Sequence, residues 1–316
     1  MRNGKRWSFL AIALIIIGFA GMAYQGFEFG DDLPSYNQKL TFAELNSLSI
    51  NSDYDVDVKF IESPDGTDYV EVRGNMEEET IDKLKNADTS TKDFTLDLKR
   101  KFRWSFMQIN FQSHNQHITV ALANPARLEQ FAVKLGSNNG SFSELTAGNI
   151  DINATSGNIH ANSVDTNHFT IHSTSGNITT TDIKADTEIK LTSGTIKVTN
   201  LDGAATLQTT SGNIKAENVK GTADVSLKSG DINFNNFTGD GKFNNVSGNI
   251  TLKNQRSDSL DISLQSGNVR LSADPGFKGI YDLRTTSGDI KSPESPGQTQ
   301  DLIKVRATSG NIRIQD

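Results

Sequence analysis

The sequence predicts an all-β protein, a parallel β-solenoid with coils of about 18 residues that follows an N-terminal transmembrane helix. A Ser-Gly-polar-Ile step recurs nine times, and apolar residues alternate with polar ones on both sides of its glycine, which predicts the solenoid. An uncharged apolar run at residues 7–24 predicts the helix. The repeat glycines are Gly157, Gly176, Gly194, Gly212, Gly230, Gly248, Gly267, Gly288 and Gly310.

Composition agrees with this fold class and excludes several functions. The chain has 316 residues, 35% of them hydrophobic, and no cysteine. It therefore has no disulfide framework, no thiolate catalysis and no cysteine-ligated metal. The formal net charge is −7, whereas a nucleic-acid-binding protein normally has a strong basic excess, so we expect no nucleic-acid partner.

The N-terminus reads as a basic flank at residues 1–6 followed by a membrane anchor at residues 7–24. A helix of that length is about 27 Å long, close to the thickness of the bilayer's hydrocarbon core. The basic flank should stay in the cytoplasm, which places the rest of the chain outside. The rival interpretation is a cleaved signal peptide with a small-x-small site at Gly21-Met22-Ala23. The length of the run favours the anchor, and both interpretations predict an extracytoplasmic location.

Residues 25–41 are predicted to form a polar stalk, and residues 42–134 irregular β coils with one short helix. Alternating apolar residues and a Pro64-Asp65-Gly66 turn indicate strands over residues 42–73. Residues 76–86 should be helical, with glutamates in the first turn and lysines near the end, as the helix dipole favours. Further strands are expected at 94–98, 106–111 and 117–122.

Residues 135–316 are predicted to form the regular solenoid. The residue two positions after each repeat glycine is Ile or Val, and the residue five positions before it is also apolar. A second glycine nine positions on, at Gly203, Gly221 and Gly239, marks the opposite turn, and Gly140 and Gly148 extend the pattern one coil earlier. Each coil is then strand, turn, strand, turn, paired in parallel with its neighbours. The usual handedness of parallel connections favours a right-handed wind.

The Ser-Gly-Asn step is itself explained by turn chemistry. Glycine allows positive φ, and the following Asn or Asp tolerates a similar conformation and bonds the local backbone. Stacked asparagines would form an amide ladder; the alternative is a polar ledge that binds a glycan or cation. We favour the structural interpretation, and the Gly-Gly-x-Gly-x-Asp pattern of calcium-binding β-rolls is missing. The ladder asparagines are Asn158, Asn177, Asn213, Asn249, Asn268 and Asn311.

Two other groups of residues are candidates for chemistry. Asp53, Asp55 and Asp57 alternate along one strand, so their carboxylates could bind calcium or cleave polysaccharide, but a solvated strand face explains them better. A basic-aromatic cluster could contact anionic lipid or wall polymer, against the favoured alternative of an exposed hairpin. We expect no catalytic residue, metal or cofactor. The cluster consists of Lys99, Arg100, Lys101 and Arg103 with Phe102, Trp104 and Phe106.

The Thr-Ser-Gly-Asn-Ile repeats, the strand pattern of residues 42–72 and the Ile118–Leu122 segment resemble the bacterial "putative adhesin" repeat family. The resemblance covers about residues 42–316, and the N-terminal anchor fits the membrane-bound LiaG-type members from cell-envelope-stress operons. It implies a solenoid and supplies no catalytic residues. Ala123-Asn124-Pro125 departs from the expected Leu-Pro step, which affects only a loop.

Three functions remain open from the sequence. The first is a non-enzymatic envelope protein that binds a cell-wall polymer or another envelope protein through the faces of the solenoid. The second is a polysaccharide-cleaving β-helix enzyme. The third is a self-assembling, bactofilin-like scaffold that associates through an unpaired C-terminal coil ending in Ile312–Ile314. Function is expected where the repeat is broken: residues 42–134, the 291–304 loop or that end.

Overall fold

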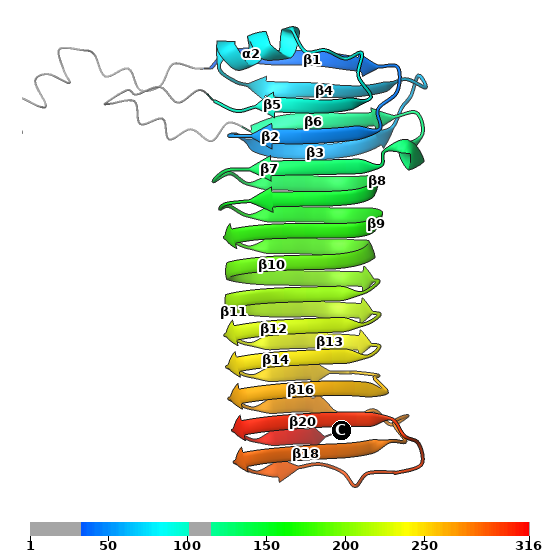
Figure 1. The fold of residues 1–316 in the computed structure, drawn as a ribbon, viewed down its shortest axis with the longest axis vertical. Helices are drawn as coiled ribbons and strands as arrows, with labels where there is room; N and C mark the ends of the chain where they lie inside the picture. Colours follow the sequence, from blue (N-terminus) through cyan, green and yellow to red (C-terminus); the bar gives the residue numbers. More distant parts are fainter. Residues whose placement is uncertain (1–32, 101–114, 316) are drawn as a thin grey trace, which may run out of the picture.

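The computed structural model describes residues 33–100 and 115–315. These residues form one long β-solenoid, with the N-terminal strands and a short helix at one end (Figure 1). The predicted all-β class and parallel pairing are confirmed. In the part of the chain that the structure describes, no helix is both long and apolar enough to cross a membrane, and the predicted anchor at residues 7–24 lies outside that part.

Each regular coil contributes a strand on either side of its repeat glycine, and these strands form the two faces of the shaft. The face before the glycine, which we call the pre-glycine face, contains β12 (Ala223–Ser229), β14 (Gly241–Ser247), β16 (Ser259–Ser266), β18 (Ile280–Ser287) and β20 (Leu302–Ser309). The post-glycine face contains β13 (Ile232–Thr238), β15 (Ile250–Lys253), β17 (Val269–Ser272), β19 (Ile290–Lys291) and β21 (Ile312–Gln315). The longer strands before them continue through the corners and belong to both faces: β8 (Gly140–Ala154), β9 (Ile159–Ser175), β10 (Ile178–Asp202) and β11 (Ala205–Lys220).

Equivalent residues of successive coils stack in register, so the core consists of straight apolar rows. Ile196 pairs with Ile214, which pairs with Ile232, and all three side chains are completely buried. Where the rows hold aromatic residues, rings meet edge to face: the ring centroid of Phe234 lies 5.8 Å from that of Phe237 and 5.1 Å from that of Phe243. Stacking therefore buries an apolar face that one coil alone would expose.

The predicted strict alternation after the glycine is wrong at one position. The sixth residue after the glycine adopts a left-handed conformation, as in Asn218 with a φ of 56°. This irregularity resets the alternation, so the seventh residue, such as Val219 or Phe237, points back into the core. The left-handed residues are Glu144, Ser163, Asp182, Asn200, Asn218, Asn236 and Asn254.

The repeat glycines are required by backbone contact as well as by conformation. Gly212 has a φ of 133°, and a Cβ atom placed on it would lie 1.8 Å from the carbonyl oxygen of Gly194 in the preceding coil. Neither backbone can yield without separating the two coils. The repeat glycines therefore combine a positive φ with a close approach to the backbone of a neighbouring coil.

The N-terminal end of the shaft is closed by antiparallel pairing and a helix. β1 (Ser35–Phe42) pairs with β4 (Asp68–Asn75), which pairs with β6 (Asn115–Leu122), both antiparallel. The helix α2 (Glu78–Lys85) buries Ile81 and Leu84 in the core, which confirms the helix predicted near residues 76–86. The remaining elements here are β2 (Ser47–Ser52), β3 (Asp55–Glu62), β5 (Asp93–Leu98), the short 3-10 helix η1 (Pro125–Arg127) and β7 (Gln130–Leu135).

Coils at both ends are stacked out of sequence order. β2 lies between β5 and β7, and β3 between β6 and β8, so an early coil is enclosed by two later ones. At the other end, β20 lies between β16 and β18, and β21 between β17 and β19. The expectation that Ile312–Ile314 forms an unpaired terminal coil is therefore wrong, because β21 is paired on both edges. The coil of β18 and β19 closes the shaft instead (Figure 1).

Candidate functional site

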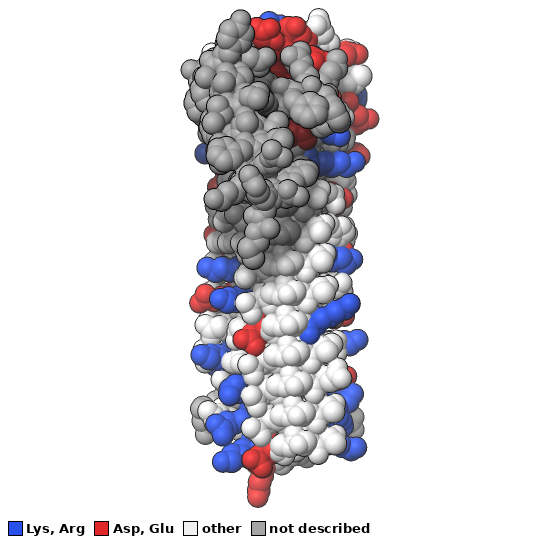
Figure 2. Space-filling view, turned by 90° about the vertical axis from the view of Figure 1, so that its left-hand side faces the viewer, with Lys and Arg blue, Asp and Glu red and all other residues white. Residues whose placement is uncertain are grey.

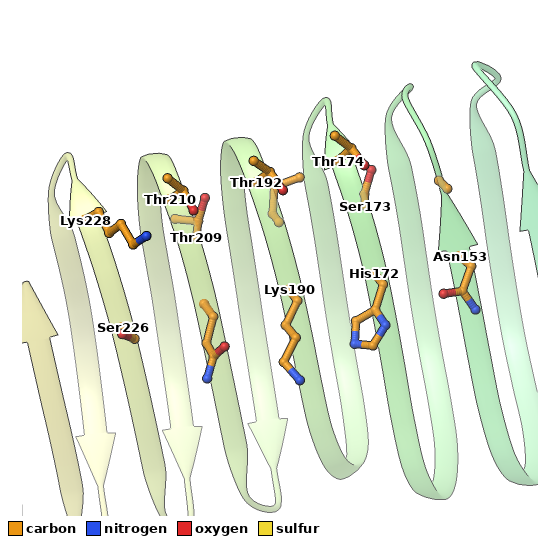
Figure 3. A pocket seen from close by; sticks show the side chains of 13 residues that line it. Asn153, His172, Ser173, Thr174, Lys190, Thr192, Thr209, Thr210, Ser226 and Lys228 are labelled. Carbon is orange, nitrogen blue, oxygen red and sulfur yellow. The ribbon is translucent and has the colours of Figure 1, made fainter.

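A shallow groove of about 450 Å³ crosses several coils of the pre-glycine face, close to the Ser-Gly corner (Figure 3). One row of its lining lies four residues before the repeat glycines and includes His172 and Lys190; a second row, two residues before them, includes the threonines at 174, 192 and 210. Each coil thus contributes at least one hydrogen-bonding side chain to the lining. The groove is lined by Asn153, Ala154, His172, Ser173, Thr174, Lys190, Leu191, Thr192, Gln208, Thr209, Thr210, Ser226 and Lys228.

The floor of the groove is an inward-facing row in which hydroxyl groups replace some aliphatic side chains. Ser173 and Thr209 are buried and occupy the row that also contains Leu191. The Ser173 hydroxyl donates to the Ser175 carbonyl at 3.1 Å, and the Thr209 hydroxyl donates to the Ser211 carbonyl at 3.5 Å. Because each of these buried hydroxyls has a hydrogen-bond partner in its own coil, burying it costs little free energy.

One carboxylate beside the groove positions two of its lining residues. Glu188 accepts hydrogen bonds from the Lys190 ammonium at 2.6 Å and lies 3.0 Å from Nε2 of His172 in the neighbouring coil. The Lys190 ammonium, followed by the His172 ring, lowers the pKa of the Glu188 carboxyl below its ordinary value. Glu188 therefore holds Lys190 and His172 side by side on adjacent strands, where their register also places them.

The Ser-Gly corner carries the predicted ladder. Asn249 donates its amide to Asp231 at 3.1 Å, and its side-chain oxygen accepts the backbone N–H of Asn268 at 3.1 Å. The same bond from backbone N–H to side-chain oxygen joins Asn177 to Asn158. Figure 2 shows a mostly uncharged column down the shaft, with Lys and Arg along its edges and a few acidic groups among them. The structural interpretation of the Ser-Gly-Asn step is confirmed, because these side chains are engaged with the next coil.

A second ladder, not predicted from the sequence, runs through the left-handed residues. Asn218 donates its amide to the side-chain oxygen of Asn200 at 2.8 Å, and Asn236 donates to Asn218 at 2.8 Å. Asn200 donates to Asp182 in turn. Asn and Asp tolerate the left-handed conformation, so one residue type serves both the turn and the ladder. The recurrence of Asn or Asp six residues after the glycine was the available signal.

The three aspartates near the N-terminal end do not converge on one site. Asp53 accepts a hydrogen bond from the backbone N–H of Arg100 at 3.0 Å, and Asp55 accepts one from that of Asn139 at 2.8 Å. Asp57 lies 3.2 Å from Nδ1 of His117. Each carboxylate thus has its own partner. Along β3 the aspartates lie on the outer face and the residues between them are buried in the core, as expected for a strand with one solvated face.

Only the first part of the basic-aromatic cluster falls within the described residues. The Arg100 guanidinium lies over the Tyr54 ring, 4.1 Å from its centroid, while Lys99 is exposed. Lys101, Arg103 and Trp104 lie outside the described residues, as does the predicted strand at 106–111. Across residues 33–100 and 115–315, no group of three or more His, Cys, Asp or Glu side chains is placed to hold a metal ion.

Comparison with solved structures finds similar chains at low sequence identity. A putative adhesin from Parabacteroides merdae ATCC 43184 is 15% identical, with 90% of this chain and 100% of that chain covered and a TM-score of 0.32. A putative adhesin from Bacteroides fragilis NCTC 9343 is 13% identical, with coverages of 90% and 97% and a TM-score of 0.32. A putative lipid binding protein from Parabacteroides distasonis ATCC 8503 is 13% identical, with coverages of 88% and 97% and a TM-score of 0.39.

None of the curated proteins compared with the chain matches it. The family model described as Toastrack DUF4097, however, matches residues 45–228 and 218–315, which together span nearly the whole solenoid. The predicted membership of a solenoid repeat family is thereby confirmed, and the chain belongs to the DUF4097 Toastrack family.

Proposed function

We propose that this protein is a non-enzymatic, adhesin-like binding protein of the cell envelope, which holds an extended polymer along its shaft. The observation that carries the proposal is the open groove on the pre-glycine face, where hydrogen-bonding side chains repeat in register at every coil. Coils stack at the ordinary strand spacing of about 4.8 Å, so a linear ligand meets equivalent groups at regular intervals. Such a surface suits a chain of hydroxyl-bearing units better than a compact small molecule.

The groove is suited to binding and not to a bond-breaking step. Its described lining contains no carboxylate: the polar groups there are hydroxyls, amides, the His172 ring and the ammonium groups of Lys190 and Lys228. Hydrolysis of a glycosidic bond normally uses two carboxyl groups on either side of that bond. The carboxylate of Glu188, beside the groove, is engaged with Lys190 and His172.

The location in the envelope is part of the same proposal. The apolar run at residues 7–24 and the basic residues before it support a single-pass anchor with the solenoid outside the membrane. The proposal also includes a role in the response to envelope stress, like that of LiaG-type proteins. The repeats and the apolar run at residues 7–24 support it. Cell fractionation with and without protease treatment of intact cells tests the location: cleavage of the solenoid from outside is expected.

The binding function is tested by pull-down from envelope extracts with the full chain as bait. Wild-type protein is expected to recover a wall polymer. A K190M/T192V/T210V variant, which removes outward polar groups from the groove, should recover much less. The matched control is K220M/T199V/T238V, which makes the same kinds of change on the post-glycine face, outside the groove. No recovery by wild type, or release of sugar from wall material by purified protein, would contradict the proposal.

A second candidate, an end-to-end scaffold, is favoured by one observation at the closing coil. Ile280, Ile290 and Leu302 are 45%, 42% and 38% exposed, and all belong to the strands at this end. Such apolar exposure at a sheet edge promotes association. Sedimentation of the full chain and of an I280K/I290K variant tests this candidate: wild-type assemblies that the variant lacks would support it, and a monomeric wild type would count against it.

A further inference from the structure

Charged side chains are arranged differently on the two faces of the shaft. On the pre-glycine face, the outward row six residues before the glycine alternates in sign from coil to coil. Asp224 pairs with Lys242, Lys242 with Asp261, and Asp261 with Lys304, whose ammonium lies 3.1 Å from the Asp261 carboxylate. Opposite charges directly across neighbouring strands are stabilising, so this row satisfies itself.

The post-glycine face has a row that does the opposite. Three residues after the glycine, Lys197 is stacked directly on Lys215. Farther along the same row, Arg313 is stacked between Arg270 and Lys291. From Lys197 to the end of the shaft this row contains no acidic residue, and the positions between its two basic groups are Asn233 and Thr251. With the exposed Lys253 beside them, these basic residues form what we call the basic strip: Lys197, Lys215, Lys253, Arg270, Lys291 and Arg313.

Within the described residues, no salt bridge neutralises any member of the basic strip, although all six side chains are exposed. Acidic residues on the same side include Glu217, two positions after Lys215 on β11, and the corner residues Asp231 and Asp289. Asp231 accepts hydrogen bonds from the backbone and amide of Asn249. The strip is thus a cationic surface on a protein whose formal net charge is −7.

Like charges directly opposite each other on neighbouring strands are destabilising. The pre-glycine face alternates opposite charges, whereas the post-glycine face places like charges on neighbouring strands. The repulsion on the post-glycine face destabilises the sheet, and a bound anion would remove it. Seven coils separate Lys197 from Lys291 in the stack, counting both, so six steps of about 4.8 Å make the strip about 29 Å long. Its shape is narrow and straight, and therefore fits a linear polyanion and not a single anion.

We propose that the basic strip binds a linear polymer with regularly repeated anionic groups, either phosphodiesters or uronate carboxylates. The inference rests on the proposed function and deepens it, because it names the charge class of the polymer and a second face that contacts it. Lysine and arginine at each end of the strip would pair with successive anionic groups, while the amide and hydroxyl side chains of Asn233 and Thr251 contact the units between them.

The test uses the full chain in mild detergent, with long-chain inorganic polyphosphate and polygalacturonate as the two probes. The five basic residues of the straight row, without Lys253 beside it, and a slope of about 0.7 per neutralised charge predict that affinity falls ~100-fold when salt rises fourfold. The strip variant K197Q/K215Q/R270Q/K291Q/R313Q, which keeps only Lys253, should lose most of this salt dependence. The matched control, K59Q/K134Q/K184Q/K220Q/K242Q, changes the net charge equally on other exposed lysines and should retain it.

The two probes distinguish the sources: preference for polyphosphate assigns phosphodiester polymers, and preference for polygalacturonate assigns uronates. Equal weakening in the strip and control variants would overturn the inference, because net charge alone would then explain binding. Binding to vesicles of phosphatidylglycerol but to neither polymer would also overturn it. If the strip variant still recovers wall polymer from extracts while no polyanion binds wild type, the strip inference fails and the groove function stands.

Discussion

The stacked glycines of the Ser-Gly corner make the sharpest prediction about stability. In Gly212→Ala, the new Cβ would lie 1.8 Å from the Gly194 carbonyl oxygen at a φ of 133°. The backbone conformation alone costs about 1–3 kcal/mol for a residue with a side chain. Relief of the contact must also separate the two coils and weaken about two ladder hydrogen bonds, at roughly 1 kcal/mol each. We expect a total loss of about 4 kcal/mol in the free energy of unfolding.

Gly66→Ala is the matched control for this prediction. Gly66 also has positive φ, 73°, but no atom lies within 4 Å of the position that its Cβ would take. Only the conformational cost of about 1 kcal/mol is expected there. Urea denaturation followed by circular dichroism measures both losses, and hydrogen exchange should locate the opening in Gly212→Ala at β10 and β11. A loss for Gly212→Ala no larger than for Gly66→Ala would refute the contact between coils as the reason for the glycine.

Three further predictions concern the second ladder, the aromatic core and the groove. Asn218→Ala should lower the free energy of unfolding by about 2–3 kcal/mol, because it removes two side-chain amide hydrogen bonds and places alanine in a left-handed conformation. Asn218→Gly should recover about 1 kcal/mol of this loss in chemical denaturation. Identical losses in the two variants would contradict a conformational role for Asn218. Phe234→Ala should cost about 3–5 kcal/mol in the same measurement, since it empties a fully enclosed site against two other rings, and a loss below 1 kcal/mol would exclude tight packing there. Lys190→Met should raise the pKa of Glu188 toward the ordinary carboxyl value, as measured by NMR titration. Because the folded-state pKa of Glu188 is lowered, the stability that it contributes is complete at pH values above the ordinary carboxyl pKa. That contribution is lost as the pH falls through the lowered, folded-state pKa. An unchanged Glu188 pKa in Lys190→Met would show that the ion pair is absent in solution.

The regular part of the fold was predictable because the same kind of residue recurs at each position of the repeat. The residue two positions after the glycine is Ile or Val in every coil, and strand alternation predicts its burial. It is buried in every coil except the closing one, where Ile290 is 42% exposed because no further coil of the described chain covers it. The left-handed residue six positions after the glycine was harder to see. Asn200, Asn218 and Asn236 look like ordinary polar strand residues until the buried residue that follows each shows that the alternation has slipped.

The order of the coils could not be predicted from local sequence. Spacings of 21 and 22 residues near Gly288 and Gly310 indicate a longer loop, but they do not say that Gly310 stacks on Gly267 and that Gly288 stacks beyond it. That choice depends on contacts between residues more than 40 positions apart. The groove was missed for a related reason, since its two rows are assembled from outward residues of several coils that no motif connects.

The inserted last coil has a consequence for how the chain folds. β18 precedes β20 in the chain, so wherever it folds first, the free edge of β16 is available to it as a partner. β18 presents Tyr281 and Leu283 at the positions where β20 presents Ile303 and Val305, so it can dock on β16 in the same register. The native arrangement then requires that this provisional pairing open and that the later strand take its place. Completion of the shaft is therefore an exchange reaction, and refolding should show a slow final phase that deletion of residues 302–315 abolishes.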